Sequence, residues 1–308
     1  MKEVSAILLT YNSEKYIEKQ IEKILNQTLK IELLVIDSSS TDNTTQILDE
    51  LNVKYFKIKK DSFNHGTTRN LGLSLAKNEI VIFITQDALP TSSNSFEKLI
   101  SPFKDKESNV SIVFGRQVPY PDTGLFGVFA RLYNYPEESY ERNIDSIPEH
   151  GIKTFFNSNS FASYKKSELL EIGGFPERII MCEDAYVAAK LILHNKSIVY
   201  NSDAVVYHSH SYNVFTEFKR YFDIGVAFKQ EPWMLDKFKG KNNQGIKYFI
   251  QELKFLLREK AFPHIPLQIF RTLAKFLGYY LGKSYERLPL QLIKIFSWNR
   301  DFWEKTRN

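Results

Sequence analysis

The sequence predicts an α/β fold: a mostly parallel, Rossmann-like sheet flanked by helices and followed by a C-terminal amphipathic helical extension. Three observations predict it. Four β-rich runs alternate with three helical patterns before residue 86, the order typical of a doubly wound sheet. The run 81–85 leads directly into Gln86 and Asp87, as a buried parallel strand does when it delivers a carboxylate to its end. Residues 241–308 instead repeat apolar side chains at helical spacing.

The first part of the chain supplies four strands and the helices between them. Strands are predicted at the apolar and β-branched runs 4–10, 31–36, 53–58 and 79–85. Ser13 can cap a helix with a stripe of isoleucines, the polar turn 38–43 has helix-capping chemistry, and a third helix fits 69–76. Parallel strands would bring their carboxyl ends to one edge of the sheet, where open α/β sheets bind ligands.

Beyond Pro90 the alternation is weaker. Further strands are expected at 110–115 and 197–206, a returning strand or turn at 154–164, and helices at 165–172 and from Glu183 onward. The segment 119–150 is rich in proline, tyrosine and acids. It is expected to form a long loop or lid over the site.

The tail differs from the rest of the chain in charge. Residues 241–308 carry 13 Lys and Arg against 5 Asp and Glu, whereas residues 1–240 carry 28 against 31. The mildly acidic front part argues against a nucleic-acid partner, while a basic, aromatic tail suits an anionic membrane or an acidic protein. Pro263 and Pro266 divide the tail into successive amphipathic helices. Their apolar face could pack on the chain's own core, form a homo-oligomer, or make peripheral membrane contact.

Composition points to the cytoplasm. The chain of 308 residues is 43% hydrophobic and 14% aromatic, enough for a substantial core. The first apolar run is short and lacks a small-residue cleavage site, so it is interpreted as a strand rather than a signal peptide. No run of eighteen uncharged apolar residues predicts a membrane span. The lone Cys182 excludes an internal disulfide and fits a reducing compartment, with the inner face of the cell membrane as a further location.

Three acids fall at strand ends or helix starts, where chemistry is expected. Asp37 could accept a hydrogen bond from a pyrimidine ring, with residues 10–12 beside the base and ribose. Asp87 could hold a divalent ion that bridges a diphosphate, because hard cations take oxygen ligands. Asp184 would then be the general base, since one carboxylate cannot easily both bind metal and accept a proton.

These residues resemble, in order, the motifs of family 2 inverting glycosyltransferases with the GT-A fold, over about residues 1–230. The motifs are Thr10-Tyr11-Asn12, Val35-Ile36-Asp37-Ser38-Ser39-Ser40-Thr41-Asp42, Arg69-Asn70-Leu71-Gly72, Thr85-Gln86-Asp87-Ala88, Gly173-Gly174-Phe175 and Glu183-Asp184. A further set looks like the bacterial rhamnosyltransferase branch: Phe63-Asn64-His65-Gly66-Thr67-Thr68-Arg69-Asn70, Gln86-Asp87-Ala88, Gly115-Arg116-Gln117, His208-Ser209-His210 and Arg220-Tyr221-Phe222-Asp223-Ile224-Gly225. One such motif is weak evidence, but five in order are strong.

The resemblance implies a role for each matched residue. Donor binding would involve Thr10, Tyr11, Asn12, Asp37, Ser39, Arg69, Gln86 and Asp87. Arg69 would approach the diphosphate as a charge-assisted donor, and His208 or His210 would complete the shell of a Mg²⁺ or Mn²⁺ ion on Asp87. Asp184, flanked by Glu183, would deprotonate the acceptor hydroxyl. The usual Asp-x-Asp is reduced here to Thr85-Gln86-Asp87, one carboxylate fewer.

The implied activity is transfer of a sugar onto a saccharide or lipid-linked saccharide in bacterial surface polysaccharide synthesis. The rhamnosyltransferase-like motifs favour L-rhamnose from dTDP-L-rhamnose, with a UDP- or GDP-linked sugar as the alternative. We expect residues 1–240 to form the GT-A domain, with a nucleotide-binding half at 1–117 and an acceptor and catalytic half at 118–240. Residues 241–308 would form the helical tail.

Other interpretations remain open at this stage. A nucleotidyltransferase shares such a sheet, but usually has a glycine-rich basic loop after its first strand, and residues 10–14 contain no glycine. A non-catalytic saccharide-binding protein on a degenerate transferase fold would explain the missing acid. Individual residues also have purely structural alternatives: Asp37 could cap the next helix, and Arg69 could pair with an acid instead of a diphosphate.

Overall fold

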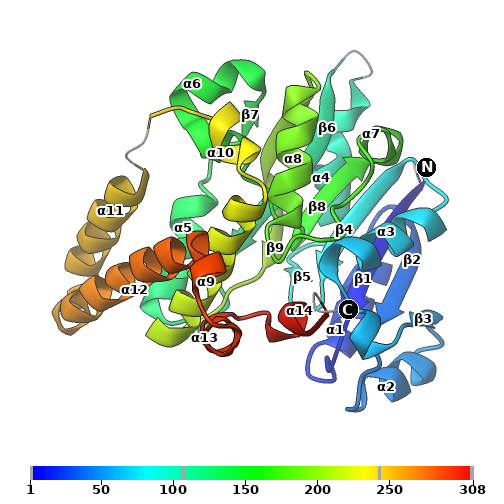
Figure 1. The fold of residues 1–308 in the computed structure, drawn as a ribbon. Helices are drawn as coiled ribbons and strands as arrows, with labels where there is room; N and C mark the ends of the chain where they lie inside the picture. Colours follow the sequence, from blue (N-terminus) through cyan, green and yellow to red (C-terminus); the bar gives the residue numbers. More distant parts are fainter. Residues whose placement is uncertain (1–2, 106–107, 242–243, 306–308) are drawn as a thin grey trace.

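A nine-stranded sheet runs through the molecule, as Figure 1 shows. The computed structural model describes residues 3–105, 108–241 and 244–305. The strand order is β3-β2-β1-β4-β8-β6-β9-β5, and β7 pairs with β9 outside this path. The strands are β1 (Glu3–Thr10), β2 (Lys30–Asp37), β3 (Tyr55–Lys57), β4 (Ile80–Thr85), β5 (Leu89–Pro90), β6 (Val110–Val118), β7 (Tyr140–Arg142), β8 (Phe161–Lys165) and β9 (Ser197–Tyr207).

The predicted parallel half is present, and the sheet as a whole is mixed. β1 pairs in parallel with β2 and with β4, and β2 pairs in parallel with β3, so Thr10, Asp37 and Thr85 end neighbouring strands. β8 enters antiparallel between β4 and β6. β6 and β9 are again parallel, which carries the chain after β9 to the edge that Asp87 occupies. The predicted GT-A-like sheet flanked by helices is confirmed.

Alternate side chains of the strands feed two cores, one on each face of the sheet. On one face, Ile7 and Phe83 pack with Leu73 of α3 (His65–Leu75) and with Val187 of α8 (Glu183–Leu193). The other face is covered by α1 (Ile17–Leu25), α2 (Thr44–Glu50) and α4 (Ser95–Ile100). Because successive side chains of a strand point to opposite faces, the continuously apolar strands β1 and β4 contribute to both cores.

The segment 119–150 is not the long loop that the sequence predicts. It forms α5 (Leu125–Asn134), β7 and α6 (Ile147–His150). Several of its prolines and acids lie in the turns, but Pro148 and Glu149 lie within α6 and Glu141 lies within β7. Phe129 of α5 is buried and packs edge-on against Tyr248. This partner lies more than 100 residues further along the chain, so the local sequence pattern does not contain the interaction that stabilises α5.

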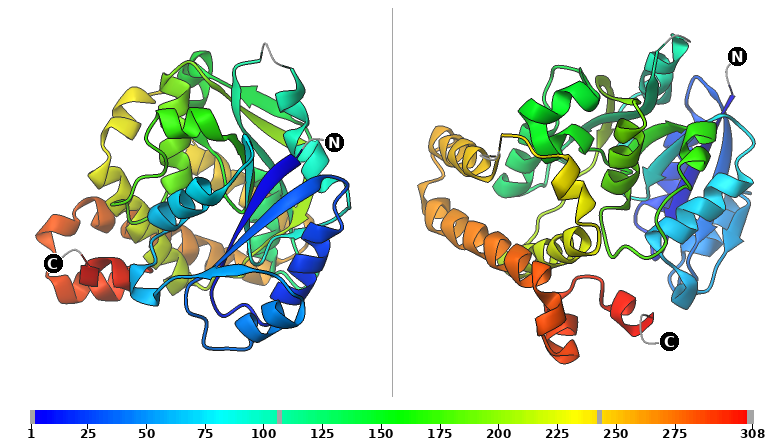
Figure 2. Two further views of the ribbon diagram at one scale, coloured as in Figure 1. Left: turned by 90° about the vertical axis from the view of Figure 1, so that its right-hand side faces the viewer. Right: turned by 45° about the horizontal axis from the view of Figure 1, so that its top comes forward.

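The C-terminal helical extension is confirmed and packs closely on α9 (Val214–Gln230). It consists of α11 (Gln244–Arg258), α12 (Ile265–Lys283), α13 (Leu290–Phe296) and α14 (Arg300–Lys305), while α7 (Lys166–Glu171) and α10 (Trp233–Lys237) belong to the preceding part. Figures 1 and 2 show α11 and α12 on the side of the molecule away from β1–β3. None of the described helices combines the length and apolar character that crossing a bilayer requires. The division at residue 240 stays a prediction.

Glycines allow the close approach of α12 to α9. A Cβ atom on Gly282 would lie 2.0 Å from the carbonyl oxygen of Phe222, and one on Gly278 would lie 2.3 Å from that of Phe218. Arg271 of α12 also donates a buried 2.6 Å hydrogen bond to Glu217 of α9. The tail is therefore tied to the preceding helix by backbone contact and by a buried ion pair.

We expect Gly282→Ala to destabilise the protein by about 1–3 kcal/mol, because backbone must move to admit the methyl group. The measurement is the denaturation midpoint in urea. Gly245→Ala is the matched control, since a Cβ there meets no atom within 4 Å and alanine favours a helix by about 0.5–1 kcal/mol. Equal midpoints for Gly282→Ala and wild type would contradict the close-packing argument.

Candidate active site

The ends of β1 and β4 are joined by one side chain at the edge of the sheet where the parallel strands end. Gln86 accepts a 2.9 Å hydrogen bond from the Tyr11 N–H and donates a 3.2 Å bond to the Tyr11 carbonyl. Lys60 lies over the Tyr11 ring, 4.9 Å from its centroid. Gln86, predicted as a donor-binding residue, therefore fixes the backbone of another predicted donor-binding residue.

Asp37 and its neighbours form a compact turn beside Thr10. The carboxylate of Asp37 is fully buried and accepts hydrogen bonds from the Ser40 N–H at 3.0 Å and the Ser40 hydroxyl at 2.5 Å. Ser39 adopts φ 59°, and its hydroxyl donates to the Ile58 carbonyl at 2.7 Å. Asp37 therefore stabilises the turn and does not cap α2, whose first residue, Thr44, donates its N–H to Asp42 at 3.0 Å.

Asn12 connects the first loop to this turn. It has φ 48°, and its side-chain oxygen accepts a 2.9 Å hydrogen bond from the Thr41 N–H. Its own N–H donates to the Ser40 hydroxyl at 3.0 Å. A left-handed conformation is one that asparagine tolerates better than most residues. Residues 10–12 and 37–40 are thereby held as one polar surface.

Asp87, His208 and His210 converge at the same edge of the sheet. His208 Nε2 lies 3.4 Å from one carboxylate oxygen of Asp87, and His210 Nε2 lies 3.7 Å from the other. One ligand atom from each residue falls within 4.8 Å of the others. His208 comes from the end of β9, which reaches this edge because it runs parallel to β6. A carboxylate with two imidazoles is a donor set that suits a divalent transition metal better than Mg²⁺, which prefers oxygen ligands.

The electrostatics of this group favour ligation. Burial alone would raise the pKa of Asp87, but the hydrogen bond from His208 and the charges of both histidines hold it well below its usual range. Burial and the charge of His208 lower the pKa of His210 to about 4. A carboxylate that stays ionised and a histidine that stays neutral are the forms that bind metal.

Asp184 lies at the start of α8, next to a buried ion pair. Glu183 bonds to Arg69 of α3 at 2.5 Å, and both side chains are buried. Asp184 accepts hydrogen bonds from the N–H groups of Ala185 at 2.8 Å and Asn159 at 3.3 Å. Burial and the neighbouring charge of Glu183 raise the pKa of Asp184 to about 6. Asp184 is therefore a carboxylate poised to accept a proton near neutral pH.

A polar network that sequence reasoning did not assign joins the two acids. Gln117 accepts at its side-chain oxygen from Arg131 and lies 2.8 Å from His208 Nδ1. Its amide nitrogen donates to Ser158 at 3.0 Å. Asn159 follows directly and holds Asp184. Gln117 stands in one of the rhamnosyltransferase-like motifs without an assigned role, whereas Ser158 and Asn159 lie in a polar loop with no motif.

The structure thus gathers the predicted residues into three adjoining groups. Asp87, His208 and His210 form the first, and Glu183, Asp184 and Arg69 form the second. The third is the polar surface at the ends of β1, β2 and β4, formed by the residues predicted to bind the donor: Thr10, Tyr11, Asn12, Asp37, Ser39 and Gln86. Tyr120 adds a further contact to the first group, because its hydroxyl donates to the Asp87 carbonyl at 3.1 Å. A metal-type donor set beside a separate base is an arrangement that can catalyse group transfer from a diphosphate.

The chain belongs to glycosyl transferase family 2, whose family model matches residues 5–173. It is therefore a glycosyltransferase, and the nucleotidyltransferase alternative is set aside. It is 39% identical to the O-antigen chain rhamnosyltransferase RfbN of Salmonella typhimurium, over 97% of this chain and 96% of that protein. It is 41% identical to the O-antigen chain rhamnosyltransferase WbaN of Salmonella anatum, over 88% and 86%.

Solved structures share the fold at lower identity. The mannosyltransferase PcManGT from Pyrobaculum calidifontis, solved with GDP-Man and Mn²⁺, superposes with a TM-score of 0.61 at 16% identity, over 92% of this chain and 88% of that one. TarS residues 1–349 from S. aureus, solved with UDP, gives a TM-score of 0.53 at 20% identity, over 93% and 91%. Both similarities support the GT-A-like fold.

We expect Asp184→Asn to raise the melting temperature at pH 7.5 by a few degrees, since a domain of this size gains about 2–4 °C per kcal/mol. Because folding raises the pKa of Asp184, the ionised carboxylate destabilises the folded state above pH 6. The gain over wild type should disappear as pH falls toward 4, where the wild-type carboxyl is protonated as well. Asp203→Asn, at an exposed site on β9, is the control. A difference that is constant from pH 4 to 8 would contradict the shifted pKa of Asp184.

Proposed function

We propose that the protein is an inverting rhamnosyltransferase that moves L-rhamnose from dTDP-L-rhamnose onto a saccharide or lipid-linked saccharide in surface polysaccharide synthesis. The observation that carries the proposal is the pairing of a metal-type group, Asp87 with His208 and His210, with a separate raised-pKa acid, Asp184. Similarity to two O-antigen chain rhamnosyltransferases over nearly the whole chain supports rhamnose as the sugar. We also propose that the enzyme works in the cytoplasm at the inner face of the cell membrane.

Asp87, His208 and His210 would hold the divalent ion, either Mg²⁺ or Mn²⁺. When bound, the ion supplies positive charge to the departing diphosphate. Gln117 orients the His208 ring from its Nδ1 side, which leaves Nε2 facing Asp87. The reduced Thr85-Gln86-Asp87 motif therefore fits a metal site in which histidines replace the missing carboxylate.

Asp184 would act as the base. In this proposal an acceptor hydroxyl gives its proton to Asp184 as its oxygen forms a bond to the anomeric carbon. The bond from that carbon to the diphosphate breaks on the opposite face, and the diphosphate leaves with the electron pair. A carboxylate with a pKa near 6 is ionised at neutral pH yet basic enough to accept the proton.

Arg69 and Glu183 would position the base. Arg69 is 6% exposed and is bonded to Glu183, so its guanidinium holds α3 against the first turn of α8. The diphosphate contact expected for Arg69 stays a prediction, as does the nucleobase contact of Asp37. Two alternatives are a UDP- or GDP-linked sugar as the donor, and a saccharide-binding protein without catalytic activity. Release of dTDP from dTDP-L-rhamnose distinguishes the proposed enzyme from both.

We expect metal-dependent release of dTDP from dTDP-L-rhamnose, and no comparable release from UDP- or GDP-sugars. A chelator should abolish the release of dTDP, because without the ion Asp87 and the two histidines do not supply the positive charge that stabilises the departing diphosphate. Asp87→Ala should also weaken Mn²⁺ binding, measured by calorimetry, by about 100-fold or more, since even outer partners of a metal site contribute 10–100-fold.

Asp203→Ala on the exposed face of β9 should change neither measurement. Faster release from a UDP-sugar would overturn the choice of donor. Nucleotide binding without turnover on any acceptor would favour the non-catalytic alternative.

We expect Asp184→Asn to lower the transfer rate by about 10²–10⁴-fold while donor binding is retained, because the variant cannot accept the acceptor's proton. In the wild type, transfer should fall about tenfold per pH unit below pH 6, as Asp184 becomes protonated. The measurement is the pH profile of kcat/KM with a fixed metal concentration. Full activity in a folded Asp184→Asn variant would refute this assignment.

A further inference from the structure

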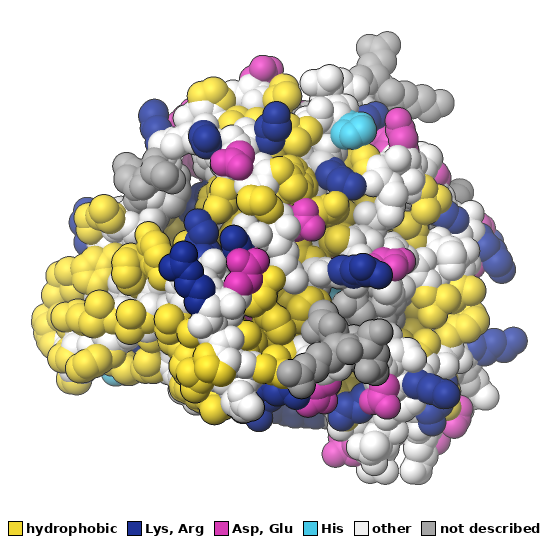
Figure 3. All heavy atoms as spheres, viewed as in Figure 1, with side chains coloured by type: hydrophobic (Ala, Val, Ile, Leu, Met, Phe, Trp, Pro, Cys, Tyr) yellow, Lys and Arg dark blue, Asp and Glu magenta, His cyan; other side chains and the backbone are white. Residues whose placement is uncertain are grey.

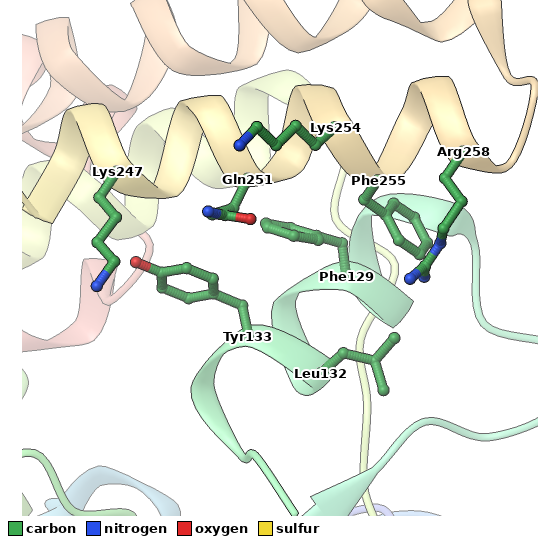
Figure 4. Close-up of a pocket in the computed structure, with 8 residues that line it drawn as sticks. All are labelled: Phe129, Leu132, Tyr133, Lys247, Gln251, Lys254, Phe255 and Arg258. Carbon is green, nitrogen blue, oxygen red and sulfur yellow. The ribbon is translucent and has the colours of Figure 1, made fainter.

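A groove between α5 and α11 lies outside the site described above. It has a volume of about 470 Å³, and Phe129, Leu132 and Tyr133 line it from the α5 side. Figure 4 shows Lys247 and Arg258 at its two ends, with Gln251 between them, all from α11. No acid lines it. An aromatic floor edged by cations suits an anionic group attached to an apolar body.

The cations of the groove form one stripe along α11. Lys247, Gln251, Lys254 and Arg258 are spaced at i, i+4, i+7 and i+11, so they share one face of the helix. In the part of the chain that the structure describes, neither Lys247 nor Lys254 has an ion-pair partner. Burial and the charges of Arg142 and Lys247 also lower the pKa of nearby Lys153 to about 8. Arg258 pairs with Glu259 at 3.2 Å, so within the described residues the uncompensated positive charge of this region is that of Lys247 and Lys254.

An exposed apolar stripe lies next to the cationic one. On α11 it consists of Ile246, Ile250 and Leu257, all exposed. On α12 it continues through side chains at helical spacing, namely Ile269, Phe270, Leu273, Phe276, Leu277 and Tyr280, of which Phe270 is 64% exposed. Figure 3 shows the resulting area of hydrophobic side chains over the region that α11 and α12 occupy in Figure 1, with Lys and Arg along part of its edge.

We propose that the exposed faces of α11 and α12 dock the protein onto an anionic phospholipid surface, with a lipid phosphate bound in the groove between α5 and α11. Apolar side chains would enter the acyl boundary, and Lys247, Lys254 and Arg258 would meet the headgroups. The stripes lie side by side on α11, which is the arrangement of a helix lying in a membrane interface.

The charge of this surface favours an anionic membrane over a second copy of the chain as its occupant. The sequence of α12 contains no Asp or Glu, and the single acid of α11, Glu252, is buried. Glu259, which follows α11, is exposed but already pairs with Arg258. A two-fold interface through this surface would bring the cationic stripes of two copies together, and neither α11 nor α12 offers an exposed acid to neutralise Lys247 and Lys254. An anionic bilayer supplies the missing negative charge.

The groove also lies on the opposite side of α5 from the metal-type group. Gly127 and Arg131 of α5, four residues apart, face the site, since a Cβ on Gly127 would lie 2.6 Å from the His210 carbonyl and Arg131 bonds to Gln117. Phe129 and Tyr133 face the groove. Membrane docking at the groove would therefore leave the active site about one helix diameter, roughly 10 Å, from the lipid headgroups. The docking proposal extends the membrane location given under the proposed function. It depends on that function only in assuming that the acceptor comes from the membrane.

The test is flotation of the full chain with vesicles of phosphatidylcholine, alone or with phosphatidylglycerol. Wild type should float only with the anionic vesicles. Lys247→Glu/Lys254→Glu should lower partitioning by about tenfold or more, because each cation near an anionic surface contributes about fivefold. Leu273→Glu/Leu277→Glu, at sites 52% and 54% exposed, should lower it to a similar extent.

Each variant has a control with the same change in charge. Lys19→Glu/Lys54→Glu and Leu25→Glu/Leu170→Glu change exposed residues on or next to α1, α2 and α7, and both should float like wild type. Wild type that stays with neither vesicle, or test variants that float like wild type, would overturn the proposal. A dimer that Leu273→Glu/Leu277→Glu converts to a monomer, without vesicle binding, would replace the lipid with a second copy.

Donor hydrolysis in solution keeps this proposal separate from the proposed function. None of the test variants touches the catalytic or donor-binding residues, so each should release dTDP like wild type. Flotation without hydrolysis would remove the rhamnosyltransferase proposal and retain the docking surface. Hydrolysis without flotation would remove the docking surface and retain the rhamnosyltransferase proposal.

Discussion

The register of β4 within the sheet is the constraint on which the rest of the site depends. Because β4 pairs in parallel with β1 and antiparallel with β8, the position of Asp87 is fixed from both sides. Both faces of β4 are buried, so a shift of one residue would exchange Val81 and Phe83 with Ile82 and Ile84 between the two cores, and the packing of both cores opposes it. The parallel pairing of β6 and β9 then brings His208 to the same edge. Hydrophobic packing thus determines where a charged group meets its partners.

The polar groups of the site are buried in a connected network, which has a cost and a use. Arg69 and Glu183 are removed from water together, and such a pair adds little net stability because desolvation offsets the attraction. Its use is positional. It joins α3 to the first turn of α8 and keeps a fixed negative charge beside Asp184, which contributes to the raised pKa of that carboxyl. The same network reaches His208 through Gln117, so the acid and the metal-type group are held in one geometry.

The sequence predicts best the features that depend on local periodicity. The early strands and the acids that follow them, Asp37 and Asp87, were predictable because apolar runs and polar turns leave a clear pattern. The structured segment containing α5 was not, because Phe129 is stabilised by Tyr248, a partner far along the chain. Ser158 and Asn159 were missed for a related reason: their role is defined by bonds to Gln117 and Asp184, which only the folded chain brings near.

The helix α5 lies between the candidate active site and the groove proposed for membrane docking. Gly127 and Arg131 contact the loop of His210 and the side chain of Gln117, whereas Phe129 and Tyr133 line the groove toward α11. A rigid helix of this kind fixes the distance between a docked surface and the reacting atoms, which a flexible linker could not do. The tail is likewise fixed, since α12 packs by backbone contact on α9 and Arg271 pairs with Glu217. If the protein docks on a membrane, the active site would lie at a fixed distance from the lipid headgroups. The length of a lipid-linked saccharide would then decide whether its acceptor hydroxyl can contact Asp184.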